Sequence, residues 1–203
     1  MGRMFLYAQV LCPYTHMPTS LLSILLPVYN AADTLTDTLE SIAAQSFTDF
    51  EIVAVDDGSV DHSTAILNAW QKRDHRLRPI FESHHGLIET LNRGFSLCRG
   101  ALIARMDADD LMHPDRLAKQ VTLLDAQPEI SVAGCLVNTF SDGPVGEGMK
   151  IYESWLNSLI EHKDIAREIF IESPIAHPSA MFRREEILAL GGYQERGWPE
   201  DYD

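Results

Sequence analysis

The sequence is poor in cysteine, in basic residues and in long apolar runs, and each scarcity argues against a class of protein. Its three cysteines, Cys12, Cys98 and Cys135, match neither a disulfide framework nor zinc-site spacing, so we expect a reducing compartment. Sixteen Lys and Arg residues stand against 30 Asp and Glu residues, a net charge of −14, so we expect no nucleic-acid partner. No apolar run approaches the roughly 18 residues of a membrane-spanning helix.

What remains is the composition of an ordinary globular protein, 45% hydrophobic and 23% charged. Its 203 residues suit one domain with a sizeable core. Residues 1–20 carry a short apolar stretch with one Arg, and we expect them to be an extension outside the fold. The chain stops at Trp198-Pro-Glu-Asp-Tyr-Asp203 with neither a helix stop signal nor a polar tail, so we expect it to be truncated there.

Short apolar runs alternate with segments in which apolar residues recur at helical spacing. We expect strands at 21–27, 51–55, 77–81, 101–106 and 130–137, with a helix after each of the first four. This alternation with short connections predicts a doubly wound α/β fold, a mostly parallel sheet with helices on both faces. The Gly-rich stretch 141–150 is expected to be a loop and a boundary, followed by a helix at 155–170, a short strand at 179–182 and a helix at 184–190.

Polar residues gather where three of these strands end. Tyr29 and Asn30 follow the first strand, Asp56 and Asp57 end the second, and a run of acids from Asp107 to Asp110 follows the fourth. In an open parallel sheet, ligands bind in the crevice at the carboxyl ends of the strands. If these strands are neighbours, the three clusters therefore share one crevice.

Asp107 and Asp109 form the most informative pair. In an extended segment, residues i and i+2 point the same way, so both carboxylates can face one hard cation. Mg²⁺ and Mn²⁺ suit such a site, since they are held by few protein carboxylates together with substrate phosphates. The alternative is a solvated acidic turn or a helix N-cap before Pro114, and the residues alone leave both open.

Three other features are ambiguous on their own. Asp56-Asp57-Gly58-Ser59 is either a common Asp-Gly turn or a nucleotide-binding acid pair. Glu200-Asp201 is either an exposed acidic pair or the source of a general base, and His177 before a proline either shapes a turn or contributes to a site.

Taken together, the motifs resemble those of family 2 glycosyltransferases, inverting enzymes of the GT-A fold. The resemblance extends from about Leu21 to Asp203. It is carried in order by Pro27-Val-Tyr-Asn30, Val55-Asp-Asp-Gly-Ser59, Leu91-Asn-Arg-Gly94, Ala104-Arg-Met-Asp-Ala-Asp-Asp110, Pro114-Asp-Arg-Leu117, His177-Pro178, Gly191-Gly-Tyr193 and Glu200-Asp201.

The resemblance implies a nucleotide site on the first half of the chain. Pro27 and Tyr29 match residues that border the nucleotide base, and Asp57 matches the acid that hydrogen-bonds it, with Asp56 beside it. Asp107 would lie near the ribose and the metal.

It also implies a metal ligand and a catalytic base. Asp109 would be the principal ligand of Mg²⁺ or Mn²⁺, with Asp107 beside it and His177, a residue close to the diphosphate, as a further candidate ligand. Asp201 matches the acid that acts as catalytic base. Members of the family usually carry a helix and acceptor-binding segments after this motif, so we expect this chain to lack part of the acceptor site.

The expected activity is metal-dependent, inverting transfer of a sugar from a nucleoside diphosphate sugar to a saccharide, lipid-linked or other hydroxyl acceptor. Residues 21–140 would form the nucleotide-sugar-binding half and 141–203 the start of an acceptor-side half. We expect a cytoplasmic protein, with peripheral association at the inner face of the membrane if the acceptor is a lipid. The alternatives are a nucleotidyltransferase of similar fold and an inactive nucleotide-binding remnant.

Overall fold

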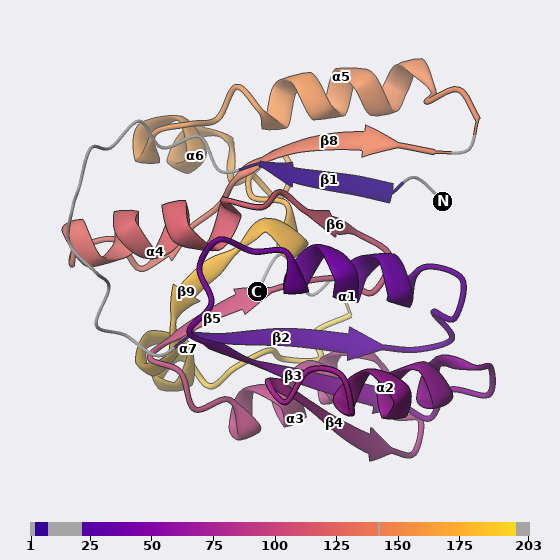
Figure 1. Ribbon diagram of the computed structural model, residues 1–203. Coiled ribbons are helices and arrows are strands. Elements are labelled where there is room, and N and C mark those ends of the chain that lie inside the picture. The colour runs from indigo at the N-terminus through magenta and orange to yellow at the C-terminus, as the bar shows by residue number, and fades with distance from the viewer. Residues whose placement is uncertain (1–2, 8–21, 142, 198–203) are drawn as a thin grey trace.

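The computed structural model describes residues 3–7, 22–141 and 143–197, and its main element is a six-stranded sheet (Figure 1). The strand order is β4-β3-β2-β5-β9-β7. β2, β3, β4 and β5 run parallel, whereas β9 lies antiparallel to both β5 and β7. The bounds are β2 (Leu22–Val28), β3 (Phe50–Asp57), β4 (Leu77–Glu82), β5 (Leu102–Arg105), β7 (Val132–Ala133) and β9 (Met181–Arg183).

Helices cover both faces of this sheet. The described helices are α1 (Leu35–Ala43), α2 (Ser63–Gln71), α3 (Leu87–Leu97), α4 (Arg116–Ala126), α5 (Glu147–Leu156), α6 (His162–Glu168) and α7 (Arg184–Leu190), with a 3₁₀ turn η1 (His177–Ser179). Apolar residues of α1, α2 and α4 pack on one face of the main sheet, and those of α3 and α7 on the other. None of the described helices is long and apolar enough to cross a membrane.

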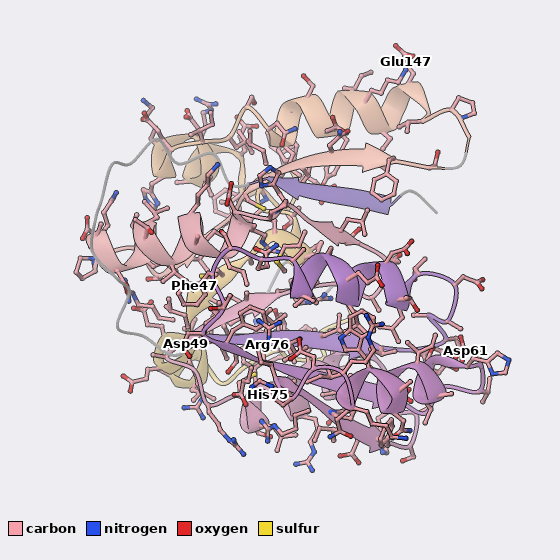
Figure 2. All side chains as sticks on the ribbon, viewed as in Figure 1. Phe47, Asp49, Asp61, His75, Arg76 and Glu147 are labelled. Carbon is pink, nitrogen blue, oxygen red and sulfur yellow. The ribbon has the colours of Figure 1, made fainter. Side chains whose placement is uncertain are left out.

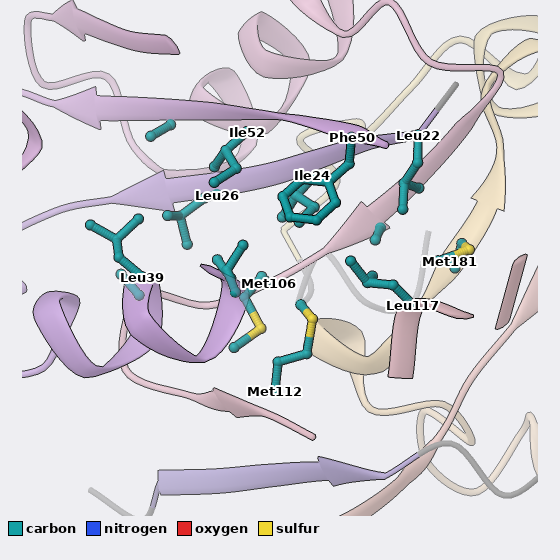
Figure 3. Close-up of a cluster of buried hydrophobic side chains, with 14 of the residues drawn as sticks. Leu22, Ile24, Leu26, Leu39, Phe50, Ile52, Met106, Met112, Leu117 and Met181 are labelled. Carbon is teal, nitrogen blue, oxygen red and sulfur yellow. The ribbon is translucent and has the colours of Figure 1, made fainter. Parts of the chain in front are cut away.

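The alternation of side chains along the strands divides the core in two. Ile24 and Leu26 of β2 face the cluster that contains apolar residues of α1, α2 and α4 (Figure 3). Leu25 points to the opposite face, where it joins Leu91 and Phe95 of α3. All seven residues of β2 are buried, as expected of a central parallel strand with helices on both sides. The predicted doubly wound α/β architecture is confirmed.

A second sheet of three strands contains the first described segment. β1 (Arg3–Tyr7) lies between β6 (Leu111–Met112) and β8 (Leu136–Phe140), parallel to β6 and antiparallel to β8. The expectation that residues 1–20 lie outside the fold is therefore wrong for residues 3–7. The backbone groups along β6 and β8 need pairing partners, and a short extended segment can provide them from anywhere in the chain.

Two further predictions differ from the structure. The strand expected at 130–137 is divided between β7 and β8, which belong to different sheets. The loop expected at 141–150 contains the start of α5, and the helix expected at 155–170 is interrupted between α5 and α6. At the interruption, the Asn157 side chain accepts a hydrogen bond from Val137 N–H at 2.8 Å and donates one to Val137 C=O at 2.7 Å.

The part of the chain after residue 141 is not separate from the main sheet. β9 pairs with β5 over Leu102–Arg183, Ile103–Phe182 and Ala104–Met181. The second half of the chain thereby packs directly against the strand that leads to Asp107.

Candidate functional site

A cleft of about 480 Å³ opens at the carboxyl ends of β2, β3 and β5. These three strands are neighbours, so the polar clusters that follow them meet, as their positions in the sequence predict. The cleft is lined by 15 residues, among them Pro27, Tyr29, Asp57, His84, Asp107 and Asp109.

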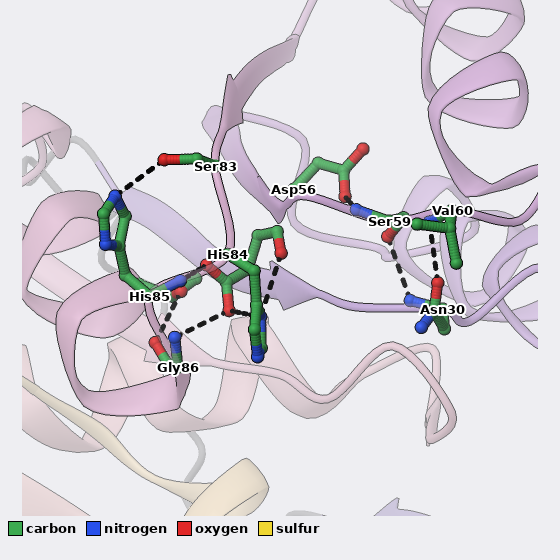
Figure 4. A network of polar contacts seen from close by, with 10 residues as sticks. Asn30, Asp56, Ser59, Val60, Ser83, His84, His85 and Gly86 are labelled. Atoms are coloured by element: carbon green, nitrogen blue, oxygen red, sulfur yellow. Dashed lines mark hydrogen bonds and ion pairs between the residues drawn. The ribbon is translucent and has the colours of Figure 1, made fainter.

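Asp57 is hydrogen-bonded by the loop that follows β4, whose residues His84, His85 and Gly86 are labelled in Figure 4. Its carboxylate accepts the backbone N–H groups of His85 at 2.7 Å and Gly86 at 2.9 Å, and it lies 2.8 Å from His84 Nδ1. The His84 ring in turn stacks on Tyr29, with ring centroids 4.3 Å apart and planes 17° apart. The end of β3 thus holds the loop after β4 in place, and Tyr29 and His84 together form an aromatic wall of the cleft.

Asp56 has a local structural role instead. It is 2% exposed, and its two oxygens accept Ser59 N–H at 3.0 Å and Thr64 Oγ1–H at 2.6 Å. It is not among the residues that line the cleft. The same turn fixes Asn30, whose N–H donates to Ser59 Oγ at 2.9 Å and whose Oδ1 accepts Val60 N–H at 2.9 Å (Figure 4).

Gly58 closes this turn against the next strand. Its φ is +72°, and a Cβ at this position would lie 2.7 Å from the backbone nitrogen of His84. Only glycine allows both the left-handed backbone and the close approach. The Asp-Asp-Gly-Ser motif therefore brings the ends of β3 and β4 together and presents Asp57, not Asp56, to the cleft.

Two threonines that the sequence analysis did not identify support the acidic turn. Thr34 Oγ1 donates to Ala108 C=O at 2.9 Å, and Thr38 Oγ1 lies 3.0 Å from the same carbonyl and 2.9 Å from that of Asp110. Residues four apart lie on the same side of a helix. The four-residue spacing of Thr34 and Thr38 at the start of α1 is therefore a signal from which the sequence could have identified them. They fix the backbone between Asp107 and Asp110 against α1.

Asp107 and Asp109 both line the cleft, and their chemistry fits a hard divalent ion. Within the described residues no group of three or more His, Cys, Asp or Glu side chains could hold a metal ion by itself.

Of the two remaining predicted site residues, the structure describes His177 but not Asp201. His177 does not line the cleft, and its Nε2 lies 2.6 Å from the hydroxyl of Tyr193. We therefore leave it out of the metal site proposed below. Asp201 falls outside the described residues, so its position relative to the cleft stays a prediction.

A second cleft, larger at about 650 Å³, lies at the amino ends of the strands, where β3 and β4 begin. Figure 2 shows Asp49, His75 and Arg76 there, well away from Asp61 beyond the other end of the strands. Asp74 pairs with Arg76 at 2.7 Å and Glu51 with Arg78 at 3.4 Å, so much of its charge is internally compensated. We take the smaller cleft as the functional one because it contains the unusual concentration of acids and lies at the carboxyl ends of the strands.

The fold and the smaller cleft define a GT-A-type protein with an acidic ligand site at the carboxyl ends of its parallel strands. The chain belongs to glycosyl transferase family 2, because the model of that family matches residues 23–191.

Curated relatives agree with this family. The chain is 30% identical over 184 residues to the amylovoran biosynthesis glycosyltransferase AmsE of Erwinia amylovora, covering 89% of this chain and 66% of that protein. It is 31% identical over 171 residues to an uncharacterized glycosyltransferase of Haemophilus influenzae, covering 82% of this chain and 52% of the relative. The chain thus spans between half and two thirds of the length of these two relatives.

Solved structures share the fold. The mannosyltransferase PcManGT from Pyrobaculum calidifontis, in complex with GDP-Man and Mn²⁺, has a TM-score of 0.70 at 22% identity, over 95% of this chain and 54% of that chain. TarS 1-349 of S. aureus in complex with UDP-GlcNAc has a TM-score of 0.67 at 21% identity, over 89% of this chain and 51% of that chain.

Proposed function

We propose that this protein transfers a sugar from a nucleoside diphosphate sugar to an acceptor hydroxyl, with inversion at the anomeric carbon. The observation that carries the proposal is the meeting of Tyr29, Asp57, Asp107 and Asp109 in one cleft at the carboxyl ends of adjacent parallel strands. The structural relatives in complex with GDP-Man and Mn²⁺ and with UDP-GlcNAc support a donor of this class.

In this proposal the donor lies across the cleft from β3 to β5. Pro27 and Tyr29 border the base, and a carboxylate oxygen of Asp57 accepts a hydrogen bond from it. Asp57 already accepts two backbone N–H groups, so it is held rigidly and needs no reorganisation when the base arrives. Asp107 faces the ribose side.

Asp109, with Asp107, would hold the divalent ion. When bound, such an ion offsets the charge that develops on the departing diphosphate. Two carboxylates repel a diphosphate, and a bound cation would offset that repulsion. The net charge of −14 is consistent with a donor site that takes positive charge from a metal ion.

Asp201 would remove the proton of the acceptor hydroxyl as that oxygen attacks the anomeric carbon from the face opposite the diphosphate. A single displacement of this kind inverts the configuration. The acceptor is a saccharide, a lipid-linked sugar or another hydroxyl compound. A cytoplasmic location, with contact to the inner face of the membrane for a lipid acceptor, belongs to the same proposal.

A thermal-unfolding panel tests the donor site. UDP, GDP, dTDP and CDP are each added with and without Mn²⁺ at about 100 times the dissociation constant, where linkage predicts about 2.7 kcal/mol of stabilisation. For a chain of this size that corresponds to a rise in Tm of about 5–10 °C. We expect at least one nucleotide to give this rise only with the metal present.

Two variants separate binding from chemistry. Asp109→Ala should abolish the metal-dependent rise, whereas Asp201→Asn should keep it and lose sugar transfer. Asp125→Ala, at an exposed position on α4, is the control and should behave as the parent. A panel without any shift would favour a remnant that no longer binds nucleotide, and metal-dependent binding that survives Asp109→Ala would refute the metal assignment.

A further inference from the structure

The crowding of Asp107, Asp109 and Asp110 is partly compensated from inside the protein. Arg105 ends β5, its side chain is 1% exposed, and its Nη1 lies 2.6 Å from Asp107 Oδ1. Asp110 is 5% exposed and interacts electrostatically with the fully buried Arg116. Asp107 is therefore matched by a fixed guanidinium, and the positive charge of the buried Arg116 lowers the cost of burying Asp110.

Arg105 reaches Asp107 from the protein interior. It is not among the residues that line the cleft, whereas Asp107 is. Its backbone N–H donates to Ala180 C=O at 2.9 Å, which ties the end of β5 to the segment between η1 and β9. The position of the guanidinium is thus fixed by the sheet and does not depend on a mobile surface side chain.

The contact between Arg105 and Asp107 is close but poorly aligned. Although Nη1 and Oδ1 are 2.6 Å apart, neither Nη1 nor Nε makes a hydrogen bond of acceptable geometry. Burying a charged guanidinium costs several kcal/mol. Since these buried donors lack other acceptors in the described part of the chain, the negative charge of Asp107 is what offsets this cost.

We propose that Arg105 is a positioning residue that holds Asp107 and weakens the attraction of the Asp107–Asp109 pair for a free divalent cation. A carboxylate whose charge is matched by a guanidinium attracts a metal less strongly than a bare one. The site then retains its metal firmly only when a diphosphate adds negative charge, so that metal and nucleotide bind cooperatively. This inference rests on the proposed function for the identity of the diphosphate.

The test is the affinity of the protein for Mn²⁺ alone, measured by electron paramagnetic resonance of free Mn²⁺. We expect Arg105→Gln, which removes the positive charge, to bind Mn²⁺ on the order of tenfold more tightly than the parent, with the gain reduced by added salt. Arg105→Lys keeps the charge and should stay close to the parent. Circular dichroism spectra check that each variant is folded.

A double-mutant cycle shows whether Arg105 acts through Asp107. In an Asp107→Asn background, Arg105→Gln should change the Mn²⁺ affinity less than twofold. The double variant also removes both charges of the pair, so that neither is left unpaired. The inference is overturned if Arg105→Gln binds Mn²⁺ no more tightly than the parent, which includes the case in which neither protein binds Mn²⁺. It is also overturned if Arg105→Gln changes the Mn²⁺ affinity equally in the parent and in the Asp107→Asn background.

The same samples separate this inference from the proposed function. With UDP, GDP, dTDP and CDP, the parent should bind Mn²⁺ more tightly in the presence of the nucleotide that it accepts, and Arg105→Gln should reduce that enhancement. If no nucleotide binds the parent, the proposed function and the cooperativity both fail. If a nucleotide binds but the enhancement is equal in parent and variant, only the role of Arg105 is refuted.

Discussion

Gly94 of α3 offers a sharp test of how closely the helices pack on the sheet. A Cβ at Gly94 would lie 2.1 Å from Leu25 Cδ1 and 3.3 Å from Val55 Cγ2, and Leu25 and Val55 are both 0% exposed. Carbon atoms pack best at about 3.5–4.0 Å. In Gly94→Ala, Leu25 must therefore change rotamer inside a closed core, or α3 must move away from β2.

Two effects of opposite sign decide the outcome. Alanine in a helix interior gains up to about 1 kcal/mol over glycine. Overpacking a core costs about 1–3 kcal/mol, and a contact as short as the one to Leu25 belongs at the upper end. We predict that Gly94→Ala lowers the free energy of unfolding by about 1–2 kcal/mol, or Tm by about 2–8 °C.

The chain contains a matched control. Gly148 lies in α5, and a Cβ there would have nothing within 4 Å. Gly148→Ala should therefore gain stability, by at most about 1 kcal/mol. Both variants are measured by urea unfolding followed by circular dichroism. Gly94→Ala at least as stable as the parent would refute the packing of α3 on β2 and β3 described above.

Two predictions concern ionisable groups elsewhere in the fold. Burial raises the pKa of the Cys98 thiol to about 12, so at pH 8 only about one thiol in ten thousand is ionised. Iodoacetamide should therefore label Cys98 slowly in the native protein and rapidly in urea, as measured by peptide mass spectrometry, and rapid native labelling would contradict its burial. Hydrogen bonds from the Arg76 side chain hold the pKa of Asp74 below its ordinary value, so the stability that Asp74 contributes is present above the unfolded-state pKa of about 3.9 and is lost as the pH falls through the lower folded-state value. Asp74→Asn should be less stable than the parent at pH 6 in urea unfolding, with a difference that shrinks below about pH 4; a pH-independent difference would exclude this ion pair as its cause.

Local patterns in the sequence were enough to predict the framework of the site. The apolar run at β2, the helical spacing of Leu35, Leu39 and Ile42, and the acids at the end of β3 and just after β5 each have a cause within about ten residues of chain. Such features follow from strand and helix periodicity and from the rule that parallel strands end at one edge of a sheet. The meeting of Tyr29, Asp57, Asp107 and Asp109 could therefore be foreseen.

The same patterns did not distinguish neighbouring acids by role. Asp56 and Asp57 are equivalent in the sequence, but the alternation of β3 and the turn at Gly58 direct Asp56 to Thr64 and Asp57 to His84. The support of the acidic turn by Thr34 and Thr38 likewise depends on how α1 is placed.

Only the tertiary structure decided which distant segments pair and which charges are buried. The pairing of β1 with β6 and β8, the division of residues 130–137 between two sheets and the contact of Asn157 with Val137 join parts of the chain that carry no mark of one another. Arg105 is adjacent to the acidic motif in sequence, yet its 1% exposure follows from strands and turns that come from other parts of the chain. Periodicity is set by the local backbone, whereas burial and pairing depend on the free energy of the whole packed chain, so the former can be recognised in a single sequence and the latter require the fold.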